Sequence, residues 1–241
     1  MPSITVQGVV LRFANYREHD RMLTLLSPDM GRIEVLSRGC RRPKSPLLPA
    51  SELFVHGEFV LFQSGERYTL TGCAIEDTFY PLRLDPDRLI CASYLLGLCQ
   101  AAAVPGEAAG ELFQLLLQGL YHLAYGTDEP PLSTLSAILL LFADVSGYRP
   151  RMNHCVHCRA VLRPEEGVLL DIIAGGLACP GCGRRSGFSI REEQVAWMKD
   201  TLRTGLTKQQ QKTDASDMVS VLRRYVESRL ETSIKAGKLL P

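Results

Sequence analysis

The sequence predicts an α+β protein in which a small N-terminal β-barrel precedes an α-helical domain with a cysteine-rich insert. Short β-rich runs separated by turn residues fill the first 80 residues, and Leu/Ala-rich segments with helical spacing follow. Four of the eight cysteines form two Cys-x2-Cys pairs late in the chain. We therefore expect a barrel domain at residues 1–80 and a helical domain at 81–241, with the insert at about 148–188.

The expected strands are β-branched or alternating runs bounded by Gly, Pro, Asn and Asp. They cover residues 4–12, 22–27, 32–38, 52–62 and 68–75. Five short strands in so few residues suit a closed barrel, and the OB type is the natural candidate. The pattern alone does not separate it from an SH3-like barrel.

The helical domain is expected to begin with helices at 86–104, 107–125 and 132–145. Residues 135–143 are apolar nearly all round, which places them at the centre of a bundle. Residues 189–192 read as a capping box that opens a helix containing Trp197. After a polar linker of three glutamines at 209–211, a last helix is expected from about Asp214 to Ala236, with Gly237 as its stop.

Composition excludes several classes of protein. The 241 residues are 46% apolar and 22% charged, which is ordinary for a globular protein. The longest apolar stretch is far shorter than the roughly 20 residues of a membrane helix, and no signal peptide is visible. We therefore expect a cytoplasmic protein with no membrane partner. No GxxxxGK[ST], GxGxxG, GxSxG or HExxH motif occurs, so we do not expect an enzyme.

The paired cysteines have the spacing of a metal site. Cys155-x2-Cys158 and Cys179-x2-Cys182 are separated by 20 residues. Two such pairs offer four thiolates to one ion, which closes a tetrahedral site and leaves no position for a substrate. We predict one structural Zn2+ per chain. An iron–sulfur cluster and a redox Cys-x2-Cys are alternatives, and the neighbouring His154 and His157 are weaker candidate ligands.

Charge is distributed unevenly although the net charge is only +1. Residues 1–50 contain eight Lys/Arg and four Asp/Glu, and residues 147–241 contain sixteen and ten, whereas the segment between them is acidic. A run of four cations within seven residues follows the third expected strand. The candidate phosphate-binding residues are Arg38, Arg41, Arg42 and Lys44, with Arg12 and Arg17 as helpers.

These cations suit a DNA-binding surface, because barrel loops hold charges outward and nearby aromatic residues can stack on bases. The competing interpretation is an ordinary solvated loop. A second basic set surrounds the cysteine insert, and it either extends the DNA track or only solubilises the insert: Arg149, Arg151, Arg159, Arg163, Arg184 and Arg185.

Several of these segments together resemble a known family. Residues 8–12, 16–26, 31–33 and 38–45, followed by Gly-Tyr-Arg-Pro at 147–150 and the two cysteine pairs, are similar to the RecO family of bacterial recombination and repair proteins. Cys40 departs from the small residue, such as Ala, expected at its position.

The resemblance implies an N-terminal OB fold, a helical C-terminal domain and, as in many members, a zinc-binding cysteine set. It also implies a non-enzymatic mediator that binds single- and double-stranded DNA and anneals complementary strands. The implied partners are RecR, single-strand-binding protein and, indirectly, the recombinase RecA, and the implied location is the nucleoid. The alternative function is a zinc-ribbon scaffold for protein contacts with incidental DNA affinity.

Overall fold

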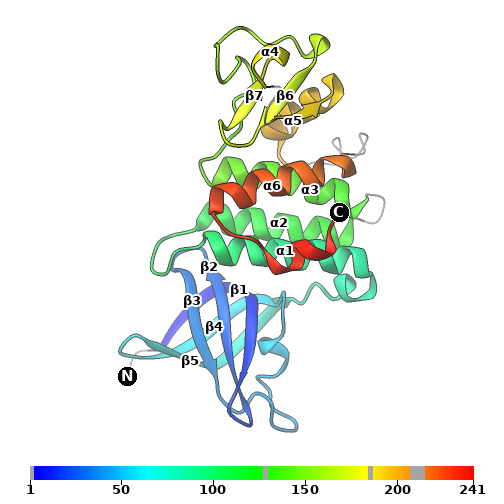
Figure 1. The fold of residues 1–241 in the computed structure, drawn as a ribbon. Coiled ribbons are helices and arrows are strands. Elements are labelled where there is room, and N and C mark those ends of the chain that lie inside the picture. The colour runs from blue at the N-terminus through cyan, green and yellow to red at the C-terminus, as the bar shows by residue number, and fades with distance from the viewer. Residues whose placement is uncertain (1–2, 127–129, 184–186, 207–214) are drawn as a thin grey trace. The chain divides into compact units, whose positions relative to one another are not determined.

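A computed structural model of the chain describes residues 3–126, 130–183, 187–206 and 215–241 (Figure 1). The chain folds into two compact units. The first comprises Met1–Asp85 and Ala92–Ala124, and the second comprises Pro86–Cys91 and Tyr125–Pro241. Helix α1 therefore contributes residues to both units. The predicted boundary at residues 80/81 instead marks the place where the strands end and the helices begin.

The first unit is built on a closed five-stranded barrel. Its strands are β1 (Ser3–Tyr16), β2 (Asp20–Ser27), β3 (Gly31–Ser37), β4 (His56–Ser64) and β5 (Arg67–Asp77). They close in the order β1-β2-β3-β5-β4, with β3 and β5 parallel and the other pairs antiparallel. This is the OB arrangement, and it removes the SH3-like alternative. Side chains such as Val10, Leu25 and Phe59 fill the interior.

The fourth strand is shorter than predicted. Residues 52–55 were expected to be extended, but a 3-10 helix at Pro49–Ser51 precedes them and Phe54 has a left-handed backbone with φ of 69°. This turn buries the Phe54 ring, which is 1% exposed. The first strand, in contrast, continues to Tyr16, and a bulge between Val10 and Arg12 bends it.

Helices continue the first unit after a 3-10 turn at Tyr80–Leu84. They are α1 (Pro86–Ala102) and α2 (Gly110–Tyr125). The β2–β3 turn is tied to the loop between them, because Ala109 N donates to Pro28 O over 2.7 Å and Gly106 N donates to Met30 O over 3.0 Å. Gly31, with φ of +61°, lies so close to this loop that a Cβ would be 2.2 Å from Val104 O.

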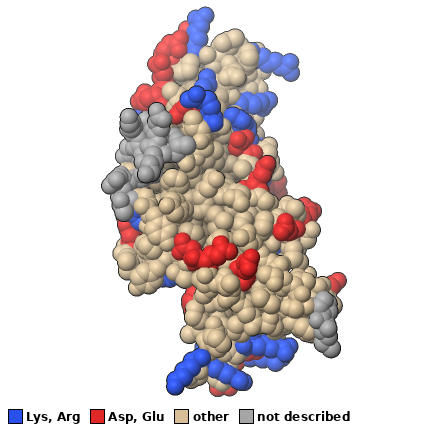
Figure 2. Space-filling view, turned by 180° about the vertical axis from the view of Figure 1, so that it is seen from behind, with Lys and Arg blue, Asp and Glu red and all other residues tan. Residues whose placement is uncertain are grey.

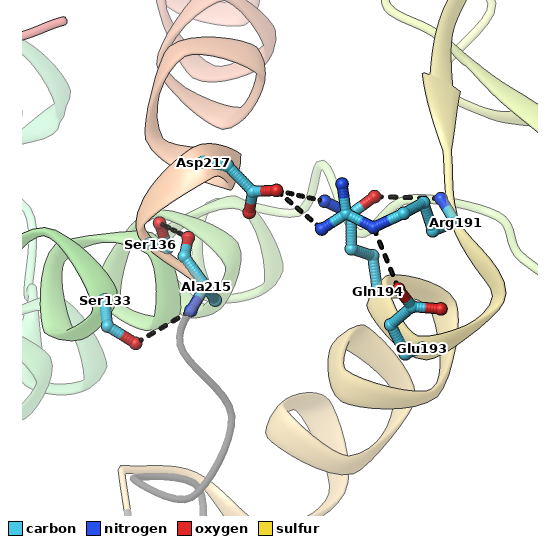
Figure 3. Close-up of polar contacts among 7 residues, drawn as sticks. All are labelled: Ser133, Ser136, Arg191, Glu193, Gln194, Ala215 and Asp217. Carbon is cyan, nitrogen blue, oxygen red and sulfur yellow. Dashed lines mark hydrogen bonds and ion pairs between the residues drawn. The ribbon is translucent and has the colours of Figure 1, made fainter.

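The second unit places α3 (Pro131–Val145) at its centre, as the apolar segment predicted. Leu135, Ile138 and Leu139 are fully buried, and α3 packs against α5 (Glu192–Thr204) and α6 (Val219–Leu230). Figure 3 shows the polar contacts that hold the chain entering α6. Ser136 Oγ donates to Ala215 O over 2.7 Å, and Ala215 N donates to Ser133 Oγ over 3.1 Å.

The cysteine insert contains a small antiparallel sheet with the order β7-β6-β8. Its strands are β6 (Val168–Asp171), β7 (Gly176–Ala178) and β8 (Gly187–Ile190), flanked by a 3-10 turn at Pro164–Glu166 and the short helix α4 (Pro180–Gly183). Gly175, with φ of 79°, makes the turn from β6 to β7. Cys179 directly follows β7, and the segment with the first cysteine pair joins β7 because Val156 N donates to Leu177 O over 3.0 Å.

Two sequence expectations about the last helices were wrong. The capping box lies two residues later than predicted, because Ser189 pairs with Leu169 in the sheet and Arg191 N donates to Gln194 Oε1 over 2.8 Å instead. The last helix ends at Leu230 rather than Ala236, since Glu231 adopts a left-handed backbone with φ of 49°.

The segment beyond Glu231 forms a separate 3-10 helix, Lys235–Leu239, which contains the predicted stop residue Gly237. Asp214 and the glutamines at 209–211 lie outside the described residues. Within the described parts of the chain, no helix has both the length and the apolar character needed to cross a membrane.

Candidate metal centre and nucleic-acid interface

The structure brings together the four predicted metal ligands. The sulfur atoms of Cys155, Cys158, Cys179 and Cys182 all lie within 4.8 Å of one another. A Zn–S distance of about 2.3 Å in a tetrahedron places sulfur atoms about 3.8 Å apart, and Cys158 Sγ lies 3.8 Å from Cys179 Sγ. The donor set and its spacing therefore fit a tetrahedral Zn2+.

Backbone hydrogen bonds shape the first knuckle. Cys155 N donates to Ala160 O over 2.8 Å, and Arg159 N donates to Cys155 O over 3.0 Å. Arg159 has φ of 63°, a left-handed conformation that reverses the chain just after Cys158. The second pair lies at the end of β7 and on α4, where Cys182 N donates to Cys179 O over 3.1 Å. Two tight turns thus direct four thiols to one point.

The thiols differ in their acidity. Burial opposes ionisation of Cys155, but N–H groups of Cys158, Cys179 and His157 directed at its sulfur lower its pKa to about 6. Hydrogen bonds with the sulfurs of Cys179 and Cys158 raise the pKa of Cys182 to about 12. A divalent cation among the sulfurs would offset their repulsion and favour the thiolate form of all four.

The histidines beside the first pair have other roles. His157 Nε2 lies 3.0 Å from Oδ2 of the buried Asp171, and Asp171 Oδ1 accepts from Ala174 N over 2.9 Å. His157 therefore ties the knuckle to the end of β6. His154 is exposed, and its backbone pairs with Val161. The remaining cysteines, Cys40, Cys73, Cys91 and Cys99, lie outside the four-sulfur cluster.

The basic run of the barrel forms a turn-rich loop after β3, and the β1–β2 turn holds it in place. Gly39 N donates to Asp20 Oδ1 over 2.8 Å, and Arg41 N donates to His19 O over 3.0 Å. Gly39 and Lys44 have φ of 64° and 63°. These contacts fix the loop backbone while its charged side chains stay outside the core.

The six predicted DNA-binding residues are all exposed: Arg12, Arg17, Arg38, Arg41, Arg42 and Lys44. Within the described residues none of them forms an ion pair with a carboxylate. Arg41 donates to Glu18 O over 3.1 Å, and the Arg17 guanidinium lies 5.3 Å from the centre of the Tyr16 ring. No ion pair therefore neutralises these charges within the described parts of the chain.

Other arginines of the barrel support the fold instead. Arg21 lies 3.9 Å from the centre of the Phe13 ring, pairs with Glu52 over 2.7 Å and donates to Ser51 O. Arg32 donates to Gln100 O over 2.8 Å. Neither arginine pairs with the carboxylate nearest to it in the sequence.

An open groove of about 720 Å³ lies on the barrel beside the basic loop. Arg17, Arg38 and Arg67 supply its positive charge, and Tyr16, Phe62 and Tyr68 supply aromatic surface. Glu34 and Glu66 also line it. Of the predicted residues, Arg17 and Arg38 line this groove, whereas Arg12 lies on β1 and Arg41, Arg42 and Lys44 lie on the loop outside the lining.

Sequence reasoning did not select Arg67 as a candidate. Arg67 begins β5, which is the neighbour of β3 in the barrel, and the basic loop follows β3. In the chain, however, Arg67 is 29 residues from Arg38. Its position directly after the Ser-Gly-Glu turn at 64–66 is the only sequence signal, because OB barrels use the loop between strands four and five for ligands.

A second set of basic residues lies around the cysteine insert. Arg149, Arg151 and Arg159 line a groove of the second unit, whereas Arg163 is exposed and pairs with Glu166 over 3.0 Å. Arg184 and Arg185 lie outside the described residues. Figure 2 shows Lys and Arg side chains over the barrel and, separately, over the part that carries the small sheet.

Comparison with known proteins agrees with this architecture. The family model "Recombination protein O N terminal" matches residues 1–79, and "Recombination protein O C terminal" matches residues 83–238. The chain belongs to the RecO family. Its role accordingly lies in DNA recombination and repair, and its N-terminal barrel is the OB domain of that family.

Individual relatives match over most of their length. The chain is 30% identical to the DNA repair protein RecO of Desulforamulus reducens, covering 98% of the chain and 93% of that protein. It is 34% identical to the RecO of Alkaliphilus metalliredigens, covering 78% and 75%. It is 27% identical to the RecO of Acetivibrio thermocellus, covering 96% and 93%.

Proposed function

We propose that this RecO-family chain binds single- and double-stranded DNA through its barrel and anneals complementary strands without hydrolysing a nucleotide. The observation that carries the proposal is the cluster of exposed cations on the barrel that have no acidic partner in the described structure. Such cations stay available to an external polyanion, which their combined charge would attract.

The site residues have complementary roles in this proposal. Arg38, Arg41, Arg42 and Lys44 contact phosphates, with Arg12 and Arg17 as additional contacts. The rings of Tyr16, Phe62 and Tyr68 in the groove offer stacking surface to unpaired bases. Phosphate contacts carry no sequence information, so base pairing between the two strands supplies the specificity of annealing.

Neutralised phosphates also explain how a non-enzymatic protein accelerates annealing. Two single strands repel each other through their backbones, and bound cations lower that repulsion without any chemical step. Affinity should therefore fall steeply with salt, with a log–log slope of about −0.7 for each phosphate contact on a single strand.

We further propose that Cys155, Cys158, Cys179 and Cys182 hold one structural Zn2+. Four thiolates would complete its coordination, so the ion would stabilise the insert and would not activate a substrate. The size of the sheet supports this assignment, because buried side chains such as Val168, Leu170 and Leu177 form only a small core and a metal commonly adds to the stability of so small a segment.

The partners follow from the family. We propose that the chain acts at the nucleoid in the cytoplasm with RecR and single-strand-binding protein, and that it assists the loading of RecA onto DNA. The alternative function is a scaffold whose main ligands are proteins and whose DNA affinity is incidental. It predicts that the chain still binds its protein partners after the barrel cations are removed.

The test compares two double variants that each remove two positive charges. Arg38→Gln with Arg42→Gln alters the proposed DNA site, and Arg163→Gln with Arg203→Gln alters exposed arginines that already pair with Glu166 and Asp200. Annealing of complementary oligonucleotides is followed by fluorescence, and single-strand affinity is measured by anisotropy over a range of salt concentrations.

The barrel variant should anneal more slowly and lose about 1.4 from the magnitude of the salt slope, corresponding to two contacts. The control variant should retain the wild-type slope. Equal slopes in the wild type and the barrel variant would exclude these arginines from the DNA site, and a folded wild type that does not accelerate annealing would favour the scaffold function.

A further inference from the structure

The second unit contains a groove whose charge the barrel site does not explain. It has a volume of about 620 Å³ and is lined by residues 149–156 together with Arg159 and Lys199. Four lining side chains are cationic, namely Arg149, Arg151, Arg159 and Lys199, and none is a carboxylate. Residues 147–163 contain four arginines and no Asp or Glu. The groove is therefore strongly positive.

Its walls are held by backbone contacts. Arg151 N donates to Gly175 O over 3.1 Å, and Leu177 N donates to Arg151 O over 2.8 Å. Gly176 permits this pairing, because a Cβ there would lie 2.4 Å from Arg151 O. Arg159 follows the first cysteine knuckle, and Lys199 comes from α5. Three different elements thus position the cations.

Two of the four groove cations differ from other cations of the same unit. Arg159 and Lys199 are exposed and have no ion-pair partner among the described residues, and Arg149 lies 3.7 Å from Asp144 Oδ2. Arg163 and Arg203 instead pair with Glu166 and Asp200 at 3.0 Å and 2.5 Å. Arg159 and Lys199 are therefore the groove cations that remain available to a ligand, whereas Arg149 pairs with Asp144 and Arg151 Nη2 donates to Ala174 O over 2.6 Å.

We propose that this groove is a second nucleic-acid site, which binds the phosphate backbone of a single strand independently of the barrel. The inference rests on the proposed annealing function, because annealing requires that one assembly hold two strands. The groove belongs to the second compact unit and the barrel site to the first, so each can hold a strand of its own.

The lining favours a polynucleotide over an acidic peptide. Its apolar residues are Pro150, Met152, Cys155 and Val156, its one ring is the imidazole of His154, and it is open to solvent. Arginine clusters can also recognise acidic peptide motifs, but this open lining has no enclosed pocket for an apolar anchor that would add specificity for a peptide. A strand with one charge per nucleotide can instead engage several cations in succession without regard to sequence.

The experiment counts bound strands on the full zinc-loaded chain. A short oligothymidylate of about 8 nucleotides, comparable to a single-strand site on an OB fold, is titrated against the wild type and three double variants. These are Arg159→Gln with Lys199→Gln in the groove, Arg38→Gln with Arg42→Gln in the barrel, and Arg163→Gln with Arg203→Gln as the matched control.

The wild type and the control should bind two oligonucleotides per chain, and the groove and barrel variants should each bind one. The groove variant should also anneal more slowly while its zinc content and circular dichroism remain those of the wild type. These readouts separate loss of the strand site from loss of the fold.

Several results would overturn the proposal. A groove variant that still binds two strands would refute the second site and leave the proposed function standing. The same conclusion would follow if the wild type bound one strand and the barrel variant bound none. A groove variant that loses binding of a hexa-aspartate peptide but not of oligothymidylate would identify a peptide site instead. A wild type that binds no oligonucleotide would refute the proposed function itself.

Discussion

Replacing one cysteine of the cluster tests both the metal site and its structural role. Cys182→Ser removes an exposed ligand at small steric cost, since serine is similar in shape. The matched control is Cys73→Ser in the barrel, where the thiol is partly buried and belongs to no cluster. Both variants change sulfur to oxygen, and only the first should affect metal binding.

The expected loss follows from the number of ligands. Structural Zn2+ binding in comparable small sites is worth about 10–16 kcal/mol, and four equivalent thiolates would each supply roughly 3 kcal/mol of it. Each 1.4 kcal/mol changes affinity about tenfold, so Cys182→Ser should bind zinc about 100-fold more weakly. The thiol's raised pKa does not protect it from this loss, because a bound cation favours the thiolate.

The assay is competition for zinc with a chelating indicator of known affinity, together with the metal content of the purified protein. The wild type should contain about one zinc per chain, and Cys73→Ser should match it. An unchanged zinc affinity in Cys182→Ser would refute the four-thiolate site. Equal losses in both variants would show that the effect comes from general destabilisation rather than from a ligand.

Two predictions concern stability and follow from individual contacts. Gly31→Ala should destabilise the first unit by about 3 kcal/mol, because the new Cβ would lie 2.2 Å from Val104 O in a left-handed conformation; a melting temperature equal to that of wild type would refute the close approach. Ser136→Ala should cost about 1–3 kcal/mol, because it leaves the buried Ala215 carbonyl without its donor. Urea unfolding measures this loss, and Ser146→Ala, at the partly exposed end of α3, should change the unfolding free energy much less.

The sequence predicted the architecture because its signals are local. Alternating strands and turn residues in the first 80 positions indicated a barrel, and the apolar segment at 135–143 indicated the centre of the helical domain. The spacing of the cysteine pairs indicated one metal site, since each pair is a complete local unit that can form a knuckle by itself.

Local signals failed where tertiary contacts override them. Ser189 has the properties of a helix cap, but its backbone is used by the β6–β8 pairing, so Arg191 and Gln194 open the helix instead. No residue pattern around Glu231 predicted the left-handed backbone conformation that ends α6. Both errors lie at helix ends, where strand pairing and backbone conformation override the local sequence signal.

The candidate sites divide in the same way. By itself, the sequence determined the candidate cysteine ligands and the basic loop, because these residues are neighbours in the chain and their chemistry is set by composition and spacing. Only the tertiary structure decided that Arg67 joins Arg17 and Arg38 in one groove, and that Lys199 faces the same groove as Arg159. Strand order and helix packing bring such distant residues together, and no local pattern records which side chains will meet.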